Sequence, residues 1–167
     1  MSKNKPPAPT PHYHLQPTQD IYHDLHHIVQ YMNYRLFDDQ LPDCLLALRS
    51  GLPSMVCLSQ QKVQDCNDHY SDTLLFHPAY FSQSPSIEWL AALAKALVHV
   101  WQRYFGTPSR HGYHNREWAT KMKTIGLYPS QTGERGGRET GDKMRYWIIE
   151  GGLLEQVANE LLADKLY

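Results

Sequence analysis

The residues with the clearest chemical potential lie between positions 93 and 102, in the stretch Leu-Ala-Lys-Ala-Leu-Val-His-Val-Trp-Gln. In the zinc-binding motif His-Glu-x-x-His, the two histidines face the same way on a helix and hold the metal, while the glutamate activates a zinc-bound water. Laid over that motif, Lys95 takes the position of the first histidine, Ala96 that of the glutamate and His99 that of the second histidine. The stretch therefore predicts a metal-site helix that lacks one ligand and its general base.

A further histidine follows this helix, in the segment His-Asn-Arg-Glu-Trp at residues 114–118. With its surroundings, this segment resembles the SprT-like family of minimal zinc metallopeptidases, which includes the Spartan proteases that cut proteins crosslinked to DNA. The resemblance covers residues 19–152, and the segments that carry it are 36–42, 70–72, 77–81, 101–106, 108–119, 121–122, 125–127, 129–130, 132–133 and 136–137.

The resemblance implies a fold, a metal and a partner. The fold would be α+β and minimal zincin-like, with an N-terminal helix, a small sheet, a central metal-site helix and shorter C-terminal helices. His114 would match the family's third ligand and join His99, with Lys95 at the position of the lost ligand. The implied cofactor is zinc, in a site that either keeps the metal or has lost it, and the implied partner is DNA or a DNA-associated protein.

The chemistry of a zinc hydrolase needs three protein ligands, an open position for water and a base that takes the proton from that water. The Ala96 side chain accepts no proton, and an exposed Lys95 stays protonated near pH 7. Burial could lower the pKa of Lys95 and turn its amine into a ligand. Alternatively, the protonated amine occupies the metal position as a built-in cation that faces His99 and His114. In both cases we expect no peptidase activity from the chain as written, whether the loss is natural or was made in the laboratory.

Charge is unevenly distributed along the chain, although 16 basic and 17 acidic residues nearly cancel. Residues 95–145 hold ten lysines and arginines against four acids, whereas residues 18–94 hold nine acids against three basic residues. This bias predicts a phosphate-binding face near the metal-site helix, and an uneven solvated surface is the competing interpretation. The side chains assigned to DNA contacts are Arg103, Arg110, Arg116, Arg135 and Arg138.

Other rings near these positions admit two interpretations each. Four aromatic side chains could stack on unpaired bases, although we expect most of them in the core: Trp101, Tyr104, Tyr113 and Trp118. His111 could recruit a metal, but a loop position that faces phosphate suits it better. His23 and His27 are spaced as metal ligands, but we expect them on a solvated surface.

Three functions fit these residues. The first is a degenerate SprT-like domain that binds DNA or proteins on DNA without cutting them. The second is a genuine metallopeptidase of that family, of which this sequence is an inactivated form. The third is a protein-interaction or inhibitory module that uses the same scaffold without DNA.

Composition agrees with one domain at residues 18–167, preceded by a Pro-rich tail at residues 1–17 that carries five prolines. The three cysteines form no Cys-x-x-Cys pair, which favours a reducing compartment over a disulfide scaffold. The sequence has no long apolar run and no apolar signal core, so we expect a cytoplasmic protein that does not enter membranes.

Apolar spacing and capping residues predict the elements that position the site. We expect a first helix capped by Thr18, strands at 44–49, 55–58 and 73–76, and a central helix at 87–104 after the Ser84-Pro85-Ser86 start signal. A third helix follows from Asn115 to the stop at Gly126, then a loop at 130–141, a strand at 144–149 and a last helix at 153–163.

Overall fold

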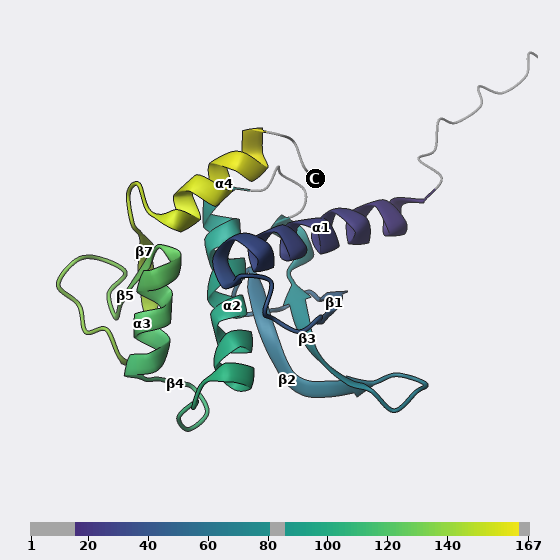
Figure 1. Ribbon diagram of the computed structural model, residues 1–167, viewed down its shortest axis with the longest axis horizontal. Coiled ribbons are helices and arrows are strands. Elements are labelled where there is room, and N and C mark those ends of the chain that lie inside the picture. Colours follow the sequence, from purple (N-terminus) through teal and green to yellow (C-terminus); the bar gives the residue numbers. More distant parts are fainter. Residues whose placement is uncertain (1–15, 81–85, 164–167) are drawn as a thin grey trace, which may run out of the picture.

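The computed structural model describes residues 16–80 and 86–163, apart from the side chains of residues 60 and 61. Its elements follow in the order α1 (Pro17–Phe37), β1 (Leu45–Leu48), β2 (Val56–Gln64), β3 (Tyr70–Phe76), the 3-10 helix η1 (Pro78–Tyr80), α2 (Ile87–Phe105), β4 (Tyr113–His114), α3 (Arg116–Ile125), β5 (Leu127–Ser130), β6 (Gly141–Asp142), β7 (Arg145–Ile148) and α4 (Leu153–Ala163). These helices and short strands make an α+β fold, as predicted, with α2 at its centre (Figure 1).

Helix α1 begins two residues earlier than the sequence predicts. Pro17 is its first residue and Gln16 precedes it as the N-cap, so the proposed cap at Thr18 is wrong. Proline suits the first helical position because its fixed φ is helical and because the N–H that it lacks would have no partner there. Residues 1–15 of the predicted tail lie outside the described residues, whereas Gln16 and Pro17 belong to the helix and its cap.

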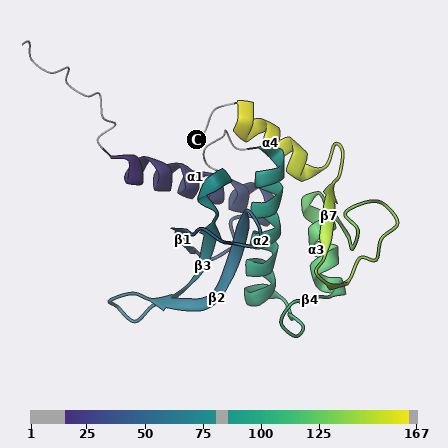
Figure 2. The ribbon, with the colours of Figure 1, turned by 180° about the vertical axis from the view of Figure 1, so that it is seen from behind.

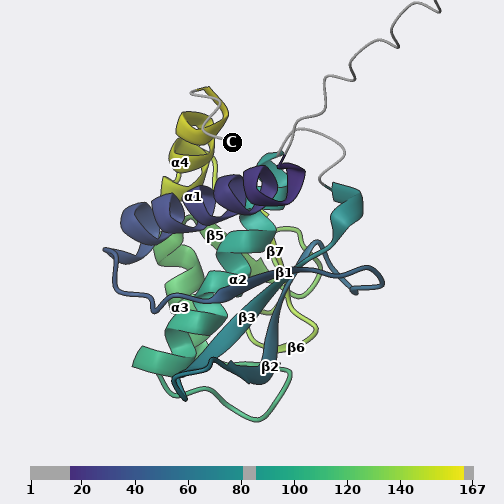
Figure 3. The ribbon, with the colours of Figure 1, turned by 90° about the vertical axis from the view of Figure 1, so that its right-hand side faces the viewer.

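The main sheet has three strands in the order β1-β3-β2, with β1 parallel and β2 antiparallel to β3. It lies along one side of α2, and α1 passes across the same helix (Figure 3). Strands β2 and β3 extend beyond the predicted segments because their backbones remain paired as far as Gln64 and Tyr70. These outer residues carry few apolar side chains, so sequence alone does not mark them as strand.

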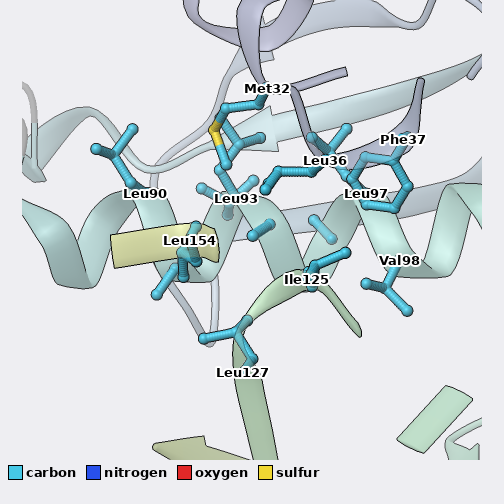
Figure 4. Close-up of a cluster of buried hydrophobic side chains, with 14 of the residues drawn as sticks. Met32, Leu36, Phe37, Leu90, Leu93, Leu97, Val98, Ile125, Leu127 and Leu154 are labelled. Carbon is cyan, nitrogen blue, oxygen red and sulfur yellow. The ribbon is translucent and has the colours of Figure 1, made fainter. Parts of the chain in front are cut away.

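Helix α2 contributes more buried residues to the core than any other element. Ser86 caps its N-terminus by accepting a 3.2 Å hydrogen bond from the Trp89 amide. Its buried face packs against α1, α3, α4 and β5, and the side chains that meet there are Met32, Leu36, Phe37, Leu90, Leu93, Leu97, Val98, Ile125, Leu127 and Leu154 (Figure 4). Among the described residues, no helix combines the length and apolar character that a membrane crossing would require.

The C-terminal half lies on the side of α2 opposite the sheet (Figure 2). Asn115 caps α3, and Gly126 ends it in a left-handed conformation with a φ of 99°, both as predicted. A side chain at position 126 would also strike the Leu154 backbone, since a Cβ there would lie 2.7 Å from its nitrogen. Strand β7 and helix α4 match the sequence prediction, whereas β4, β5 and β6 are strands of two to four residues that it missed.

Candidate functional site

A cleft of about 530 Å³ lies between the face of α2 that carries Lys95 and His99 and the strands around it. Lys95, Ala96 and His99 line it from α2, while His114 lines it from β4 and Tyr146 from β7. Strand β2 forms another wall, through residues 56–58. Four elements, α2, β2, β4 and β7, therefore converge on the positions that spacing and resemblance singled out.

The two predicted histidines lie next to each other in this cleft. The ring centroids of His99 and His114 are 5.1 Å apart, and both rings rest against the indole of Trp118. His99 stacks on that indole, whereas His114 meets it edge-on at 4.4 Å. Because Trp118 is completely buried, its ring is a fixed surface against which both imidazoles are positioned.

The tautomer of His114 follows from its hydrogen bond. Its Nδ1 lies 3.1 Å from the carbonyl oxygen of Gly141 in the paired strand β6. A carbonyl oxygen can only accept, so Nδ1 carries the proton and donates it. Nε2 of the neutral ring is therefore left with a free lone pair, the arrangement that orients metal-binding histidines.

Both imidazoles are held in the neutral form. Burial lowers the pKa of His99 to about 3, and His114 and Lys95, whose protonated forms would repel a protonated His99, act in the same direction. Burial likewise lowers the pKa of His114, again helped by Lys95. Near pH 7 the two rings therefore contribute no charge to the cleft.

Lys95 enters the same cleft and ends at a backbone acceptor. Its Nζ donates a 2.8 Å hydrogen bond to the carbonyl oxygen of Met144 and lies 5.9 Å from the centre of the Tyr146 ring. Burial lowers its pKa from the ordinary value of 10.5. Ala96 beside it is only 4% exposed and presents a methyl group to the cleft.

The donor set of this cleft does not fit a zinc ion bound by three protein ligands. His99 and His114 supply two nitrogens, but the Lys95 amine donates to the Met144 carbonyl oxygen, and lysine is not among the ordinary ligands of zinc. Within residues 16–80 and 86–163, no group of three or more His, Cys, Asp or Glu side chains is placed to hold a metal ion. Restoring the site would require a histidine at position 95.

A hydrogen-bond network behind the cleft holds the segment that carries His114. The buried Gln102 amide donates to Asn115 Oδ1 and to Glu117 Oε1, both at 2.8 Å. Glu117 also accepts from the Thr107 amide, and it leaves no room for a side chain at Gly106. Sequence reasoning missed Gln102 and Glu117, although a glutamine on the buried face of an apolar helix was a usable signal.

The five predicted DNA-contact arginines do not gather at one place. Arg103 and Arg110 line the cleft, where each already contacts a carboxylate, Asp72 at 3.2 Å and Asp142 at 2.9 Å. The other three lie outside its lining: Arg116 on α3, and Arg135 and Arg138 in the loop at residues 131–140.

The remaining rings divide between core and surface. Trp118 is in the core, but Trp101 is only half-buried and Tyr104 and Tyr113 are exposed, so the expectation that most of these four rings lie in the core is wrong. His111 lines the cleft from an exposed loop position, while His23 and His27 lie on α1 and take no part in it.

No protein-family model, no curated protein and no solved structure matches this chain, so its own residues and their geometry carry the functional argument.

Proposed function

We propose that this chain is a SprT-like domain with a minimal zincin-like fold that has no peptidase activity and serves as an intracellular binding module for DNA or DNA-associated protein. One observation carries the proposal. His99 and His114 meet in a single cleft in which Lys95 and Ala96 occupy the positions of the expected ligand and the expected base. An arrangement of this kind keeps the shape of a metallopeptidase site without its reactive groups.

Hydrolysis of a peptide needs a polarised water and a base for its proton, and the cleft supplies neither. The methyl group of Ala96 takes no proton. The imidazoles of His99 and His114 are neutral, but without a third ligand they bind zinc poorly. Removing the base and one ligand together predicts a loss of peptidase activity down to the uncatalysed rate.

Metal content and proteolysis of revertants test this proposal. We expect the purified chain to contain less than one zinc in ten molecules and to leave casein intact. Lys95→His with Ala96→Glu should bind zinc and gain chelator-sensitive proteolysis, because both remaining histidines are already together.

Lys95→His alone is the matched control, since it should gain the metal without the base. Chelator-sensitive proteolysis by the unmodified chain would contradict the proposal. If the double variant binds zinc and cuts casein, the sequence is an inactivated form of an enzyme. If the double variant binds no zinc, the zincin-like assignment is overturned.

The DNA part of the proposal rests on the basic bias of residues 95–145. Two arginines of this basic region lie in the loop between β5 and β6, beside a polar and an aromatic side chain. Arg135 lies 5.1 Å from the centre of the Trp147 ring, and Arg138 donates to Gln131 Oε1 at 2.9 Å. Within residues 16–80 and 86–163, neither arginine forms an ion pair with a carboxylate, so both charges remain available to phosphate.

A DNA titration at low and near-physiological salt tests this part. We expect micromolar or weaker binding that falls steeply as salt rises, because released counterions drive phosphate contacts. Arg135→Glu with Arg138→Glu should abolish it. Arg49→Glu with Lys62→Glu, a pair of exposed reversals in the acidic half, should change it little. Binding that ignores both salt and the reversals in the loop would favour a protein-interaction module without DNA.

A further inference from the structure

The charges that line the cleft are all of one sign. Three basic side chains, Lys95, Arg103 and Arg110, reach it, and none of the described residues that line it is Asp or Glu. Each arginine is countered by a carboxylate from outside the lining, Asp72 or Asp142. Lys95 is different, because its amine donates a hydrogen bond to an uncharged group, the Met144 carbonyl oxygen.

An ammonium in this position gains free energy when an anion reaches it. Charged groups that leave water without an opposite charge are strongly disfavoured, and the Lys95 pKa is lowered by burial for this reason. The bond to Met144 uses one of the three N–H donors of the amine, so two remain to bind a ligand. The groups that face the Lys95 amine from other elements are Cys57, His114 and Tyr146, and His99 faces it from the same helix. Burial raises the pKa of Tyr146 to about 12, so its phenol stays neutral.

We propose that the Lys95 amine forms a binding site for the carboxylate of a polypeptide, at a chain end or on an acidic side chain, in the cleft where a peptidase would hold its metal. The inference rests on the proposed function to the extent that the cleft binds peptides without cutting them. It adds the chemical group that the cleft selects.

The charge and the walls of the cleft favour a carboxylate over a phosphate. Of the three lysine and arginine side chains that line the cleft, both arginines are countered by carboxylates, so Lys95 brings one uncountered positive charge, which one carboxylate neutralises. A phosphate carries up to two negative charges and is best bound by several cations. The walls are lined by apolar residues that suit the side chains of a peptide better than a sugar-phosphate chain: Pro53, Val56, Leu58, Ala92, Pro108 and Tyr113.

The test compares three ligands on the full chain by NMR and calorimetry: N-acetyl-Ala-Ala-Leu with a free carboxylate, the same peptide with a C-terminal amide, and inorganic phosphate. The free acid should shift the Lys95 and His114 side-chain resonances and bind at least about tenfold more tightly than the amide, as a hydrogen bond to a charged group implies. Phosphate should bind more weakly than the acid. Three results would each overturn the inference: equal binding of acid and amide, tighter binding of phosphate than of the acid, or no binding of the acid at about 10 mM. A concentration of about that order marks the weakest affinity of interest.

Lys95→Met removes the charge at similar length and should lower the affinity for the acid to that for the amide. Lys62→Met, which removes an exposed lysine of β2 outside the cleft, should leave the affinity unchanged. If Lys95→Met fails to fold, the comparison of acid with amide on the unmodified chain still decides. Mass spectrometry of the recovered peptide separates the two proposals, because cleavage would overturn the proposed function, whereas an intact peptide bound without regard to its carboxylate overturns only this site.

Discussion

The two sides of the cleft floor differ in how far they match the metallopeptidase site that the resemblance implies. On the α2 side, Lys95 and Ala96 stand where the resemblance expects a ligand and a base. On the β4–α3 side, His114 has the expected identity, and its ring is held by Gly141 and by the Trp118 indole. The reactive groups are therefore missing from one side, while the structural supports are present on the other.

The difference teaches that the chemistry and the scaffold of this site are separable. Alanine has the best helix propensity, so Ala96 costs helix α2 nothing. The Lys95 amine donates a hydrogen bond to the Met144 carbonyl oxygen, so it is not left without a partner. Trp118 and Asn115, by contrast, each make several contacts that the fold itself needs, and changes there should affect stability.

The largest expected effect is the removal of the shared support on the β4–α3 side. Trp118 is completely buried and contacts both imidazoles, so Trp118→Ala should lower the free energy of unfolding by about 3–5 kcal/mol. Trp101→Ala on α2 is the matched comparison, because that ring is half-buried and lies under Lys121. We expect it to cost less than about 3 kcal/mol. Denaturant unfolding of both variants measures the difference, and equal losses would contradict the asymmetry.

The sequence was most informative where local signals act alone. Ser86, Asn115 and Gly126 mark helix ends through their own side chain or backbone preference, and all three positions match the structure. Strands β4 and β6 have two residues each, too few for any alternation, and form only because the chain brings them together. For this reason the loop predicted at 130–141 in fact ends in a strand that orients His114.

The site shows the same division. The spacing of residues 95–99 and the resemblance at residues 114–118 identified the two histidines that share the cleft. The Met144 acceptor of Lys95 and the Gln102–Glu117 contact depend on pairs 49 and 15 residues apart, which no local pattern encodes. Likewise, the basic composition of residues 95–145 did not reveal that Asp72 and Asp142 counter two of the arginines.

A smaller effect should separate two helix caps. Asn115 Oδ1 accepts from the Trp118 amide and the Gln102 side chain, while its Nδ2 donates to the Thr107 carbonyl and the Ser109 hydroxyl. Ser86 makes the single cap bond to Trp89. Asn115→Ala should therefore cost about 2–3 kcal/mol of unfolding free energy against about 1 for Ser86→Ala. Amide exchange in α3 should rise in the first variant only, and similar losses in both would show that the network behind the cleft adds nothing to the cap.

The last expected effect is the response of the free energy of unfolding to pH. Burial, with the charges of His114 and Lys95, lowers the pKa of His99 from 6.5 to about 3 in the folded chain, while the unfolded chain keeps a value near 6.5. Between these values the unfolded state binds more protons, so the free energy of unfolding is complete above about pH 6.5 and falls as the pH decreases. The slope contributed by His99 is at most about 1.4 kcal/mol per pH unit. His99→Phe keeps a ring against Trp118 but does not titrate, so its stability should decline less between about pH 6 and 4. Parallel curves for the two proteins, recorded by denaturant unfolding at each pH, would mean that His99 is not buried against α3 as the structure places it.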